Sequence, residues 1–180
     1  MSKIVQKFKV DGKEVIFRCT EVKDAEAIFL MHTSLHKEKA MTAMNEKPKL
    51  KEVKEKLKNR IEKAKNKQMI DFVVEIEGKV RGRAMVFKSE KRAQGHIGTL
   101  GIHLDKETRG KGIGSKLIDV AIKEAKEVLK IKMITLEVMA QNKGAIKLYK
   151  RKGFDKYGKL DRGIEHYGKL VDIILMVKYF

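Results

Sequence analysis

The chain has 180 residues and a formal net charge of +18, because 42 lysines and arginines outnumber 24 aspartates and glutamates. Its hydrophobic content of 42% is enough for one core of ordinary size, so we expect a single domain over residues 1–180. Cys19 is the only cysteine, which excludes an internal disulfide and favours a reducing compartment. Residues 1–10 lack the apolar segment of a signal peptide, and no apolar run is long enough for a membrane span. We therefore expect a cytoplasmic protein without membrane contact.

The high positive charge suggests nucleic acid as a partner, but its distribution argues against one. Most basic residues are lysines scattered through helices beside glutamates, and there is no clustered basic run with interleaved aromatic residues. This pattern is typical of a lysine-rich solvated surface. The charge can still attract an anionic cofactor.

The first half of the chain predicts one strand, two helices and a hairpin. Alternating apolar residues predict the strand, a helical period predicts the helices, and Glu77-Gly78-Lys79 has the chemistry of a tight turn. In order, the elements are Glu14 to Cys19, Asp24 to His36, a helix after Pro48 with an apolar stripe from Leu50 to Ala64, Met69 to Ile76, and Val80 to Phe87.

The second half alternates strands and helices, and its centre is typical of a βαβ unit. In order, the elements are a strand His96 to Leu104, a glycine-rich loop, a helix with an apolar stripe from Ile113 to Val128, a strand Met133 to Val138, a helix Asn142 to Lys152, and a hairpin of Phe154 to Tyr157 with Leu170 to Tyr179. We expect the loop of that hairpin to contain Asp161, Arg162, Glu165 and His166.

The loop Arg109-Gly110-Lys111-Gly112-Ile113-Gly114-Ser115 predicts a phosphate site. Its three glycines let the backbone approach an anion, and the helix that follows adds the partial positive charge of its N-terminus. The spacing does not fit a Walker loop, and the dinucleotide fingerprint fails because position 117 is leucine. What remains is Arg-x-x-Gly-x-Gly at the start of a helix.

This loop and a second motif, Asn142-x-x-Ala145-x-x-Leu148-Tyr149-x-x-x-Gly153-Phe154, together resemble the GNAT superfamily of N-acetyltransferases. The resemblance implies an α/β (α+β) fold with a mixed central sheet of about seven strands and flanking helices. It also implies a splayed pair of strands, ending at Leu104 and Val138, that holds acetyl-CoA.

The resemblance assigns roles to residues of this chain. The cofactor pyrophosphate would bind backbone N–H groups of the loop that runs from Arg109 through Gly110, Lys111, Gly112, Ile113 and Gly114 to Ser115. The pantetheine arm would pair with the backbone of Ile102, His103 and Leu104, and an N–H there would bind the thioester oxygen. Asn142 would hydrogen-bond the cofactor, and it also fits a helix N-cap. Tyr149 would donate a proton to the leaving thiolate.

The general base is the least defined part of the predicted site. Many family members use a glutamate on the strand before the loop, but Ile97 to Gly101 contains no carboxylate. His96 is the next candidate, because histidine titrates near physiological pH. Glu137, Glu165, His166 and a chain of waters remain open, as does the face toward which His103 points.

The predicted function is acetyl transfer from acetyl-CoA to a primary amine, either of a small molecule or of a protein. The reaction needs no metal. A homodimer is open, and nucleic acid is disfavoured as a partner. The loops around His32 to Pro48 and Gly158 to Gly168 would line the acceptor side and carry no readable signature. The alternative is a catalytically weak module that senses acetyl-CoA or binds ribonucleoprotein.

Overall fold

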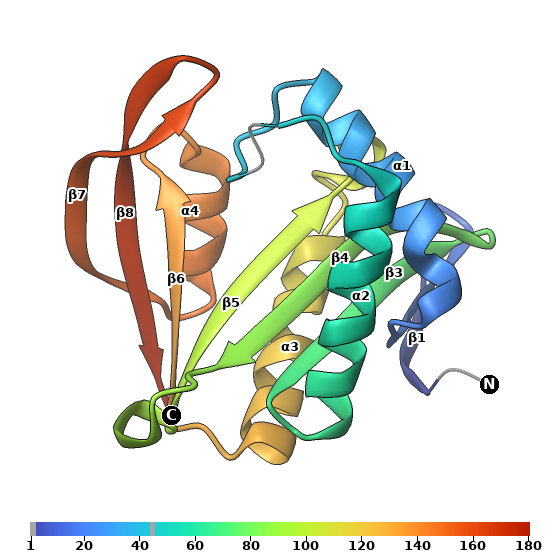
Figure 1. The fold of residues 1–180 in the computed structure, drawn as a ribbon, viewed down its shortest axis with the longest axis horizontal. Coiled ribbons are helices and arrows are strands. Elements are labelled where there is room, and N and C mark those ends of the chain that lie inside the picture. The colour runs from blue at the N-terminus through green and yellow to red at the C-terminus, as the bar shows by residue number, and fades with distance from the viewer. Residues whose placement is uncertain (1–2, 44–45) are drawn as a thin grey trace.

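A computed structural model describes residues 3–43 and 46–180, which form one eight-stranded sheet between two layers of helices (Figure 1). The strand order is β1-β2-β3-β4-β5-β6-β8-β7. The strands are β1 (Ile4–Val10), β2 (Lys13–Cys19), β3 (Met69–Ile76), β4 (Lys79–Lys88), β5 (Ile97–Leu104), β6 (Met133–Met139), β7 (Asp155–His166) and β8 (Lys169–Tyr179). The helices are α1 (Ala25–Lys37), α2 (Leu50–Lys65), α3 (Ile113–Leu129) and α4 (Lys143–Arg151).

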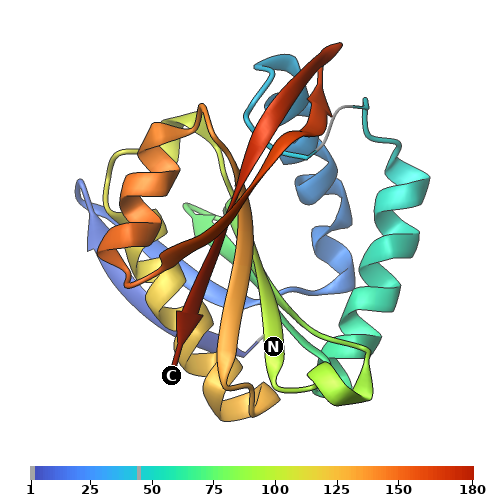
Figure 2. The ribbon, with the colours of Figure 1, turned by 90° about the vertical axis from the view of Figure 1, so that its left-hand side faces the viewer.

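The helices lie on opposite faces of the sheet, α1 and α2 on one and α3 and α4 on the other (Figure 2). The apolar stripe of α3 packs on strands β2 to β6, and partly buried residues of α4 join this larger core. A smaller core of Ala25, Ile28, Val53, Leu57, Val73 and Val80 fixes α1 and α2 to the other face. In the part of the chain that the structure describes, no helix is long and apolar enough to cross a membrane.

The predicted fold class is confirmed, with two differences in the strands. Strand β1 was not predicted, although Lys7 to Val10 alternate, and all of its residues are exposed or only partly buried. It pairs with β2 through Asp11 and Gly12, both at positive φ, as a tight hairpin turn requires. Strand β7 is longer than predicted, so the expectation of a loop at Asp161, Arg162, Glu165 and His166 is wrong. These residues lie in β7, which continues to pair with β8 across an irregularity between Leu160 and Ile164.

Strands β5 and β6 splay apart, as the family resemblance implies. They are parallel and pair only at Ile97 with Met133, Gly98 with Ile134, and Thr99 with Thr135. Beyond Thr99, β5 pairs with β4 alone, and beyond Thr135, β6 pairs with β8 alone. Within the described part of the chain, one edge of β5 therefore has no strand partner near its C-terminal end (Figure 1).

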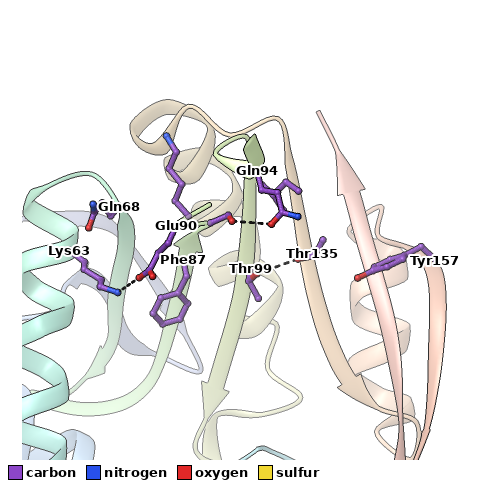
Figure 3. A pocket seen from close by; sticks show the side chains of 11 residues that line it. Lys63, Gln68, Phe87, Glu90, Gln94, Thr99, Thr135 and Tyr157 are labelled. Carbon is purple, nitrogen blue, oxygen red and sulfur yellow. Dashed lines mark hydrogen bonds and ion pairs between the residues drawn. The ribbon is translucent and has the colours of Figure 1, made fainter. Parts of the chain in front are cut away.

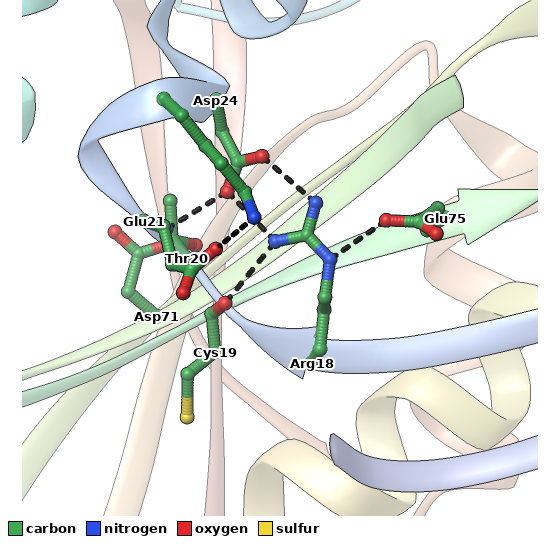
Figure 4. Close-up of polar contacts among 8 residues, drawn as sticks. Arg18, Cys19, Thr20, Glu21, Asp24, Asp71 and Glu75 are labelled. Atoms are coloured by element: carbon green, nitrogen blue, oxygen red, sulfur yellow. Dashed lines mark hydrogen bonds and ion pairs between the residues drawn. The ribbon is translucent and has the colours of Figure 1, made fainter. Parts of the chain in front are cut away.

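Polar contacts of Arg18 and Asp71 fix the start of α1 and the segment before it to the sheet, and Figure 4 shows those of Arg18 with Asp24 and Glu75 and of Thr20 with Asp71. Arg18 on β2 donates to both carboxylate oxygens of Asp24 at 2.8 Å and to Glu75 on β3 at 2.7 Å. Asp71 on β3 accepts a hydrogen bond from the Thr20 hydroxyl at 2.8 Å and forms a buried ion pair with Arg83 on β4. The start of α1 is thereby held in place relative to the centre of the sheet.

Candidate active site

The glycine-rich loop presents free backbone donors at the start of α3. Gly110 and Gly112 have φ of 77° and 76°, a backbone region that favours glycine. No side chain of the described residues caps the helix, so its first N–H groups remain available to an anion. A Cβ at Gly112 would meet no atom within 4 Å, so the glycine is required for its backbone angle and not for space. At Gly114 a Cβ would lie 3.1 Å from Leu104, so this glycine allows α3 to pack closely on β5.

Arg109 supports this loop instead of pointing into it. Its Nε donates to the carbonyl of Leu104 at 2.9 Å, and its guanidinium forms an ion pair with Glu38 after α1. The side chain therefore joins the end of β5 to the end of α1. The Leu104 carbonyl, predicted to bind the cofactor, already accepts a hydrogen bond.

Along the free edge of β5, only every second residue turns its backbone N–H and C=O groups toward the splay. The N–H of Asp105 donates to Arg81 on β4 at 2.9 Å, so the backbone of His103, two residues earlier, also faces β4. The backbone groups of Ile102 and Leu104 then face the splay. Of the three residues predicted here, Ile102 and Leu104 are placed to pair with an extended ligand and His103 is not.

The His103 side chain instead packs against His32 of α1. Their ring centroids are 5.8 Å apart and the rings are nearly perpendicular. His32 Nε2 and His103 Nδ1 are buried and have no hydrogen-bond partner among residues 3–43 and 46–180. Burial lowers the pKa of His32 to about 3 and that of His103 to about 4, with a further contribution from the positive charge of Arg83. Both imidazoles are therefore neutral at pH 7.

Tyr149 and Asn142 lie on and before α4, on the α3 side of the sheet. The Asn142 side chain caps α4 by accepting a hydrogen bond from the Ala145 N–H at 3.1 Å, which is the second role predicted for it. The Tyr149 ring packs on Phe154, with centroids 5.8 Å apart. Burial raises the pKa of Tyr149 to about 12, so the phenol keeps its proton throughout the physiological range.

The candidate bases are placed very differently. His96 is exposed and precedes β5 at the closed end of the splay, where its carbonyl accepts hydrogen bonds from Lys132 and Met133. It lies three residues before Thr99, a distance of about 10 Å along a strand. Glu137 lies on β6, two residues beyond the last paired residue, Thr135, and is exposed on the same face.

His166 and Glu165 belong to the β7–β8 hairpin, whose tip contacts the end of α1. The His166 Nε2 lies 3.0 Å from the carbonyl of Ala40, and the Tyr167 hydroxyl donates to the carbonyl of His36 at 3.0 Å. These contacts link the two segments expected to line the acceptor side. Met44 and Asn45, which belong to the first of them, lie outside the described residues.

A pocket of about 490 Å³ opens on the α2 side of the sheet, at the closed end of the splay (Figure 3). Thr99 and Thr135 lie side by side on its floor, with their hydroxyl oxygens 3.4 Å apart. Phe87 lies on the β4 side and Tyr157 on the β7 side. Glu137 lies on the same face, two residues beyond Thr135 along β6, and we refer to the pocket together with this adjoining face of β5 and β6 as the groove.

Arg60 on α2 lies beside this groove, next to the lining residue Phe87, and was not predicted from the sequence as a site residue. Its guanidinium carbon lies 5.6 Å from the centroid of the Phe87 ring, and the side chain is partly buried. The signal that could have found it is its position, three residues after Leu57 and four before Ala64, within the apolar stripe of the helix.

The comparisons with known proteins agree with this geometry. The acetyltransferase (GNAT) family model matches residues 34–154. The spermine/spermidine N(1)-acetyltransferase of Bacillus subtilis (strain 168) is 40% identical over 58 residues, which cover 32% of this chain and 38% of that protein. The L-amino acid N-acetyltransferase of Escherichia coli (strain K12) is 28% identical over 103 residues, covering 57% and 64%.

The chain thus aligns with less than two thirds of the length of each of these two curated relatives. Among solved structures, an acetyltransferase from Salmonella typhimurium with its cofactor acetyl-CoA superposes with a TM-score of 0.80 at 18% identity. That match covers 92% of this chain and 93% of the other, and shows the shared fold. Because the family model covers more than half of the sequence and agrees with the splay and the glycine-rich loop, the chain belongs to the acetyltransferase (GNAT) family.

Proposed function

We propose that this protein is an N-acetyltransferase that moves the acetyl group of acetyl-CoA to a primary amine. The observation that carries the proposal is the separation of β5 from β6 after Thr99, directly before an uncapped helix N-terminus. An extended ligand that ends in phosphates needs both features, a free strand edge and a cluster of N–H donors. The structure of the Salmonella typhimurium neighbour with acetyl-CoA supports this choice of ligand.

The residues present fit the cofactor through their main chains. The N–H groups at Gly112, Ile113 and Gly114 would hold the pyrophosphate, and the Ile102 backbone would pair with the pantetheine arm. When bound, acetyl-CoA supplies an acetyl group activated as a thioester. An N–H on the free edge of β5 would stabilise the negative charge that develops on its oxygen.

The proton transfers would occur from opposite faces of the sheet. Glu137 is on the α1/α2 face and would take the proton of the attacking amine, directly or through a water. Tyr149 is on the α3/α4 face and would donate a hydrogen bond to the departing sulfur. We prefer Glu137 to His96 as the base because His96 lies at the closed end of the splay. An amine with a reference pKa of ~10.4 arrives mostly protonated, so an acceptor of this proton is needed.

The comparisons leave the acceptor open. The two curated relatives are named for different amines, a polyamine and an L-amino acid. The choice between such acceptors must therefore come from side chains of the groove in this chain.

The test is release of free thiol from acetyl-CoA with a panel of polyamines, amino acids, aminoglycosides and peptides. Glu137→Gln is expected to lower turnover by about 100-fold or more without changing acetyl-CoA affinity, because loss of a general base typically costs 10²–10⁴-fold. His96→Gln is the matched control and should leave turnover within about twofold, because an exposed residue outside the site contributes little. If His96→Gln lowers turnover and Glu137→Gln does not, His96 is the base and Glu137 is not. Acetyl-CoA binding without turnover on any amine would favour a sensing module.

A further inference from the structure

Arg60 is a cation beside the acceptor groove that, within residues 3–43 and 46–180, makes no direct contact with an anionic side chain. Three neighbouring cations are satisfied: Arg83 pairs with Asp71, Lys63 with Glu90 at 2.6 Å, and Lys88 donates to the Leu129 carbonyl at 2.9 Å. Within residues 3–43 and 46–180, Arg60 forms neither a hydrogen bond nor an ion pair, and its guanidinium lies over the Phe87 ring. A partly buried guanidinium with five unused donors is suited to bind an anionic ligand.

The strand register places this guanidinium beside the splay. Phe87 and Met85 face α2 from β4 and pair with Thr99 and Gly101 of β5. Gly101 is therefore the residue of β5 that follows the last paired residue on this face, and it has no side chain to fill the groove. Burial lowers the pKa of Arg60, and the charge of Arg83 lowers it further while Asp71 opposes the change. The guanidinium is thus partly desolvated close to where the amine must attack.

Glu137 lies across Gly101 from Arg60. Continuing the pairing of Thr99 with Thr135 by two residues puts Gly101 of β5 and Glu137 of β6 at the same level of the sheet. Among the described residues, Glu137 also has no hydrogen bond or ion pair. These two charged groups at the groove, for which no pairing is found within residues 3–43 and 46–180, have opposite signs. Strands β4 and β6 flank β5 with a separation of about 10 Å where all three are paired, and beyond Thr99 the splay widens this gap and leaves room for a small molecule with both an amine and an anion.

We propose that Arg60 binds a carboxylate of the acceptor, so that the amines acetylated by this protein belong to amino acids or to peptides with an acidic first residue. The inference rests on the proposed N-acetyltransferase function and specifies its substrate. Arg60 is a specificity residue that binds the carboxylate of the acceptor, while Glu137 faces the amine of the acceptor. A polyamine would instead bring further positive charge toward an unpaired guanidinium.

The experiment compares acceptors that differ only in the carboxylate. One pair is L-methionine with L-methioninamide, which probes free amino acids. The other is a tripeptide amide that begins with aspartate and its counterpart that begins with asparagine, which probes peptides. The selectivity is the ratio of kcat/KM for the acid to kcat/KM for the neutral partner. We expect a ratio above ten in at least one pair, and the pair identifies the source of the carboxylate.

Arg60→Gln should reduce that ratio by about 10- to 100-fold, as expected for loss of a charge-assisted bidentate contact, while acetyl-CoA affinity stays unchanged. Arg60→Lys keeps the charge and should retain part of the selectivity. Lys58→Gln removes the same charge from an exposed position of the same helix and should leave the ratio unchanged. A wild-type preference for the neutral partners or for spermine, or an unchanged ratio in Arg60→Gln, would overturn the proposal.

A binding measurement separates this proposal from the proposed activity. Calorimetry with the CoA-saturated protein would compare N-acetyl-L-methionine with its amide, and the acetylated aspartyl peptide with its asparaginyl counterpart. If no amine is acetylated but the acid binds more tightly through Arg60, the carboxylate site is supported and the activity is refuted. If amines are acetylated without such a preference, the activity is supported and the carboxylate site is refuted. Variants that fail to fold are recognised by circular dichroism, and Arg60→Lys then serves as the deciding variant.

Discussion

Replacing Tyr149 by phenylalanine tests how the leaving thiolate is stabilised. Burial raises the pKa of this phenol to about 12, whereas a thiol has a reference pKa of ~8.5. The phenol is thus the weaker acid by about 3.5 pKa units, so complete proton transfer to the thiolate would be uphill by about 4.8 kcal/mol. We therefore expect Tyr149 to act by donating a hydrogen bond to the developing negative charge. A hydrogen bond to a charged group contributes about 1.5–3 kcal/mol, so Tyr149→Phe should lower kcat by about 10- to 150-fold.

The pH profile makes this prediction specific. The ratio of kcat for wild type to kcat for Tyr149→Phe should stay constant from about pH 7 to 10, because a phenol with a pKa of about 12 remains protonated there. The assay is thiol release at saturating acceptor, with acetyl-CoA affinity measured separately by calorimetry. Tyr179→Phe is the control, since Tyr179 is 68% exposed on β8. A ratio near one would refute the role of the hydroxyl, and a ratio that falls by half near pH 10 would refute the effect of burial.

Three further predictions concern the loop and the buried polar groups. Gly112→Glu should weaken acetyl-CoA binding at least tenfold by calorimetry, whereas Gly12→Glu, at a similar φ of 77° and likewise with no atom within 4 Å of its Cβ, should not. Asp71→Asn leaves Arg83 buried without its counter-ion and should lower the free energy of unfolding in urea by about 3–5 kcal/mol; a loss below 1 kcal/mol would contradict this. His32 and His103 have pKa values of about 3 and about 4, below the unfolded value of ~6.5, so the unfolded state binds more protons in acid. Stability should fall below about pH 6.5 by up to ~1.4 kcal/mol per pH unit for each histidine, and His32→Leu should have a smaller slope.

The sequence predicts the strands and helices of the centre better than those at the two ends of the sheet. The core strands β3 to β6 are apolar runs bounded by turns, so their pattern is local and clear. Strand β1 lies at an edge, where lysines replace half of the apolar pattern, although Asp11-Gly12 is a turn signal that could have revealed it. Strand β7 is the opposite edge. Its Gly158 and its charged residues suggest a loop, and only pairing with β8 shows that the strand continues.

The cofactor side of the site was predictable for a similar reason. The loop from Arg109 to Ser115 and the segment from Asn142 to Phe154 are contiguous motifs, so their spacing is visible in the sequence. The contacts of individual side chains could not be predicted without the fold. Arg109 contacts Glu38, and His103 contacts His32, because β5 ends beside α1, a proximity between segments about 70 residues apart that no local pattern reveals.

The proposed acceptor side combines such distant segments, which explains why it carried no signature. Arg60 comes from α2, Phe87 from β4 and Glu137 from β6. The net charge of +18 could not replace this information, because most lysines that form ion pairs do so on the surface, where pairs contribute little and salt screens them. That charge is suited to attract an anionic cofactor of any kind. In our proposal, selectivity for the acceptor depends instead on the few groups that folding brings close together and that have no partner among the described residues, and at this groove those groups are a carboxylate and a guanidinium.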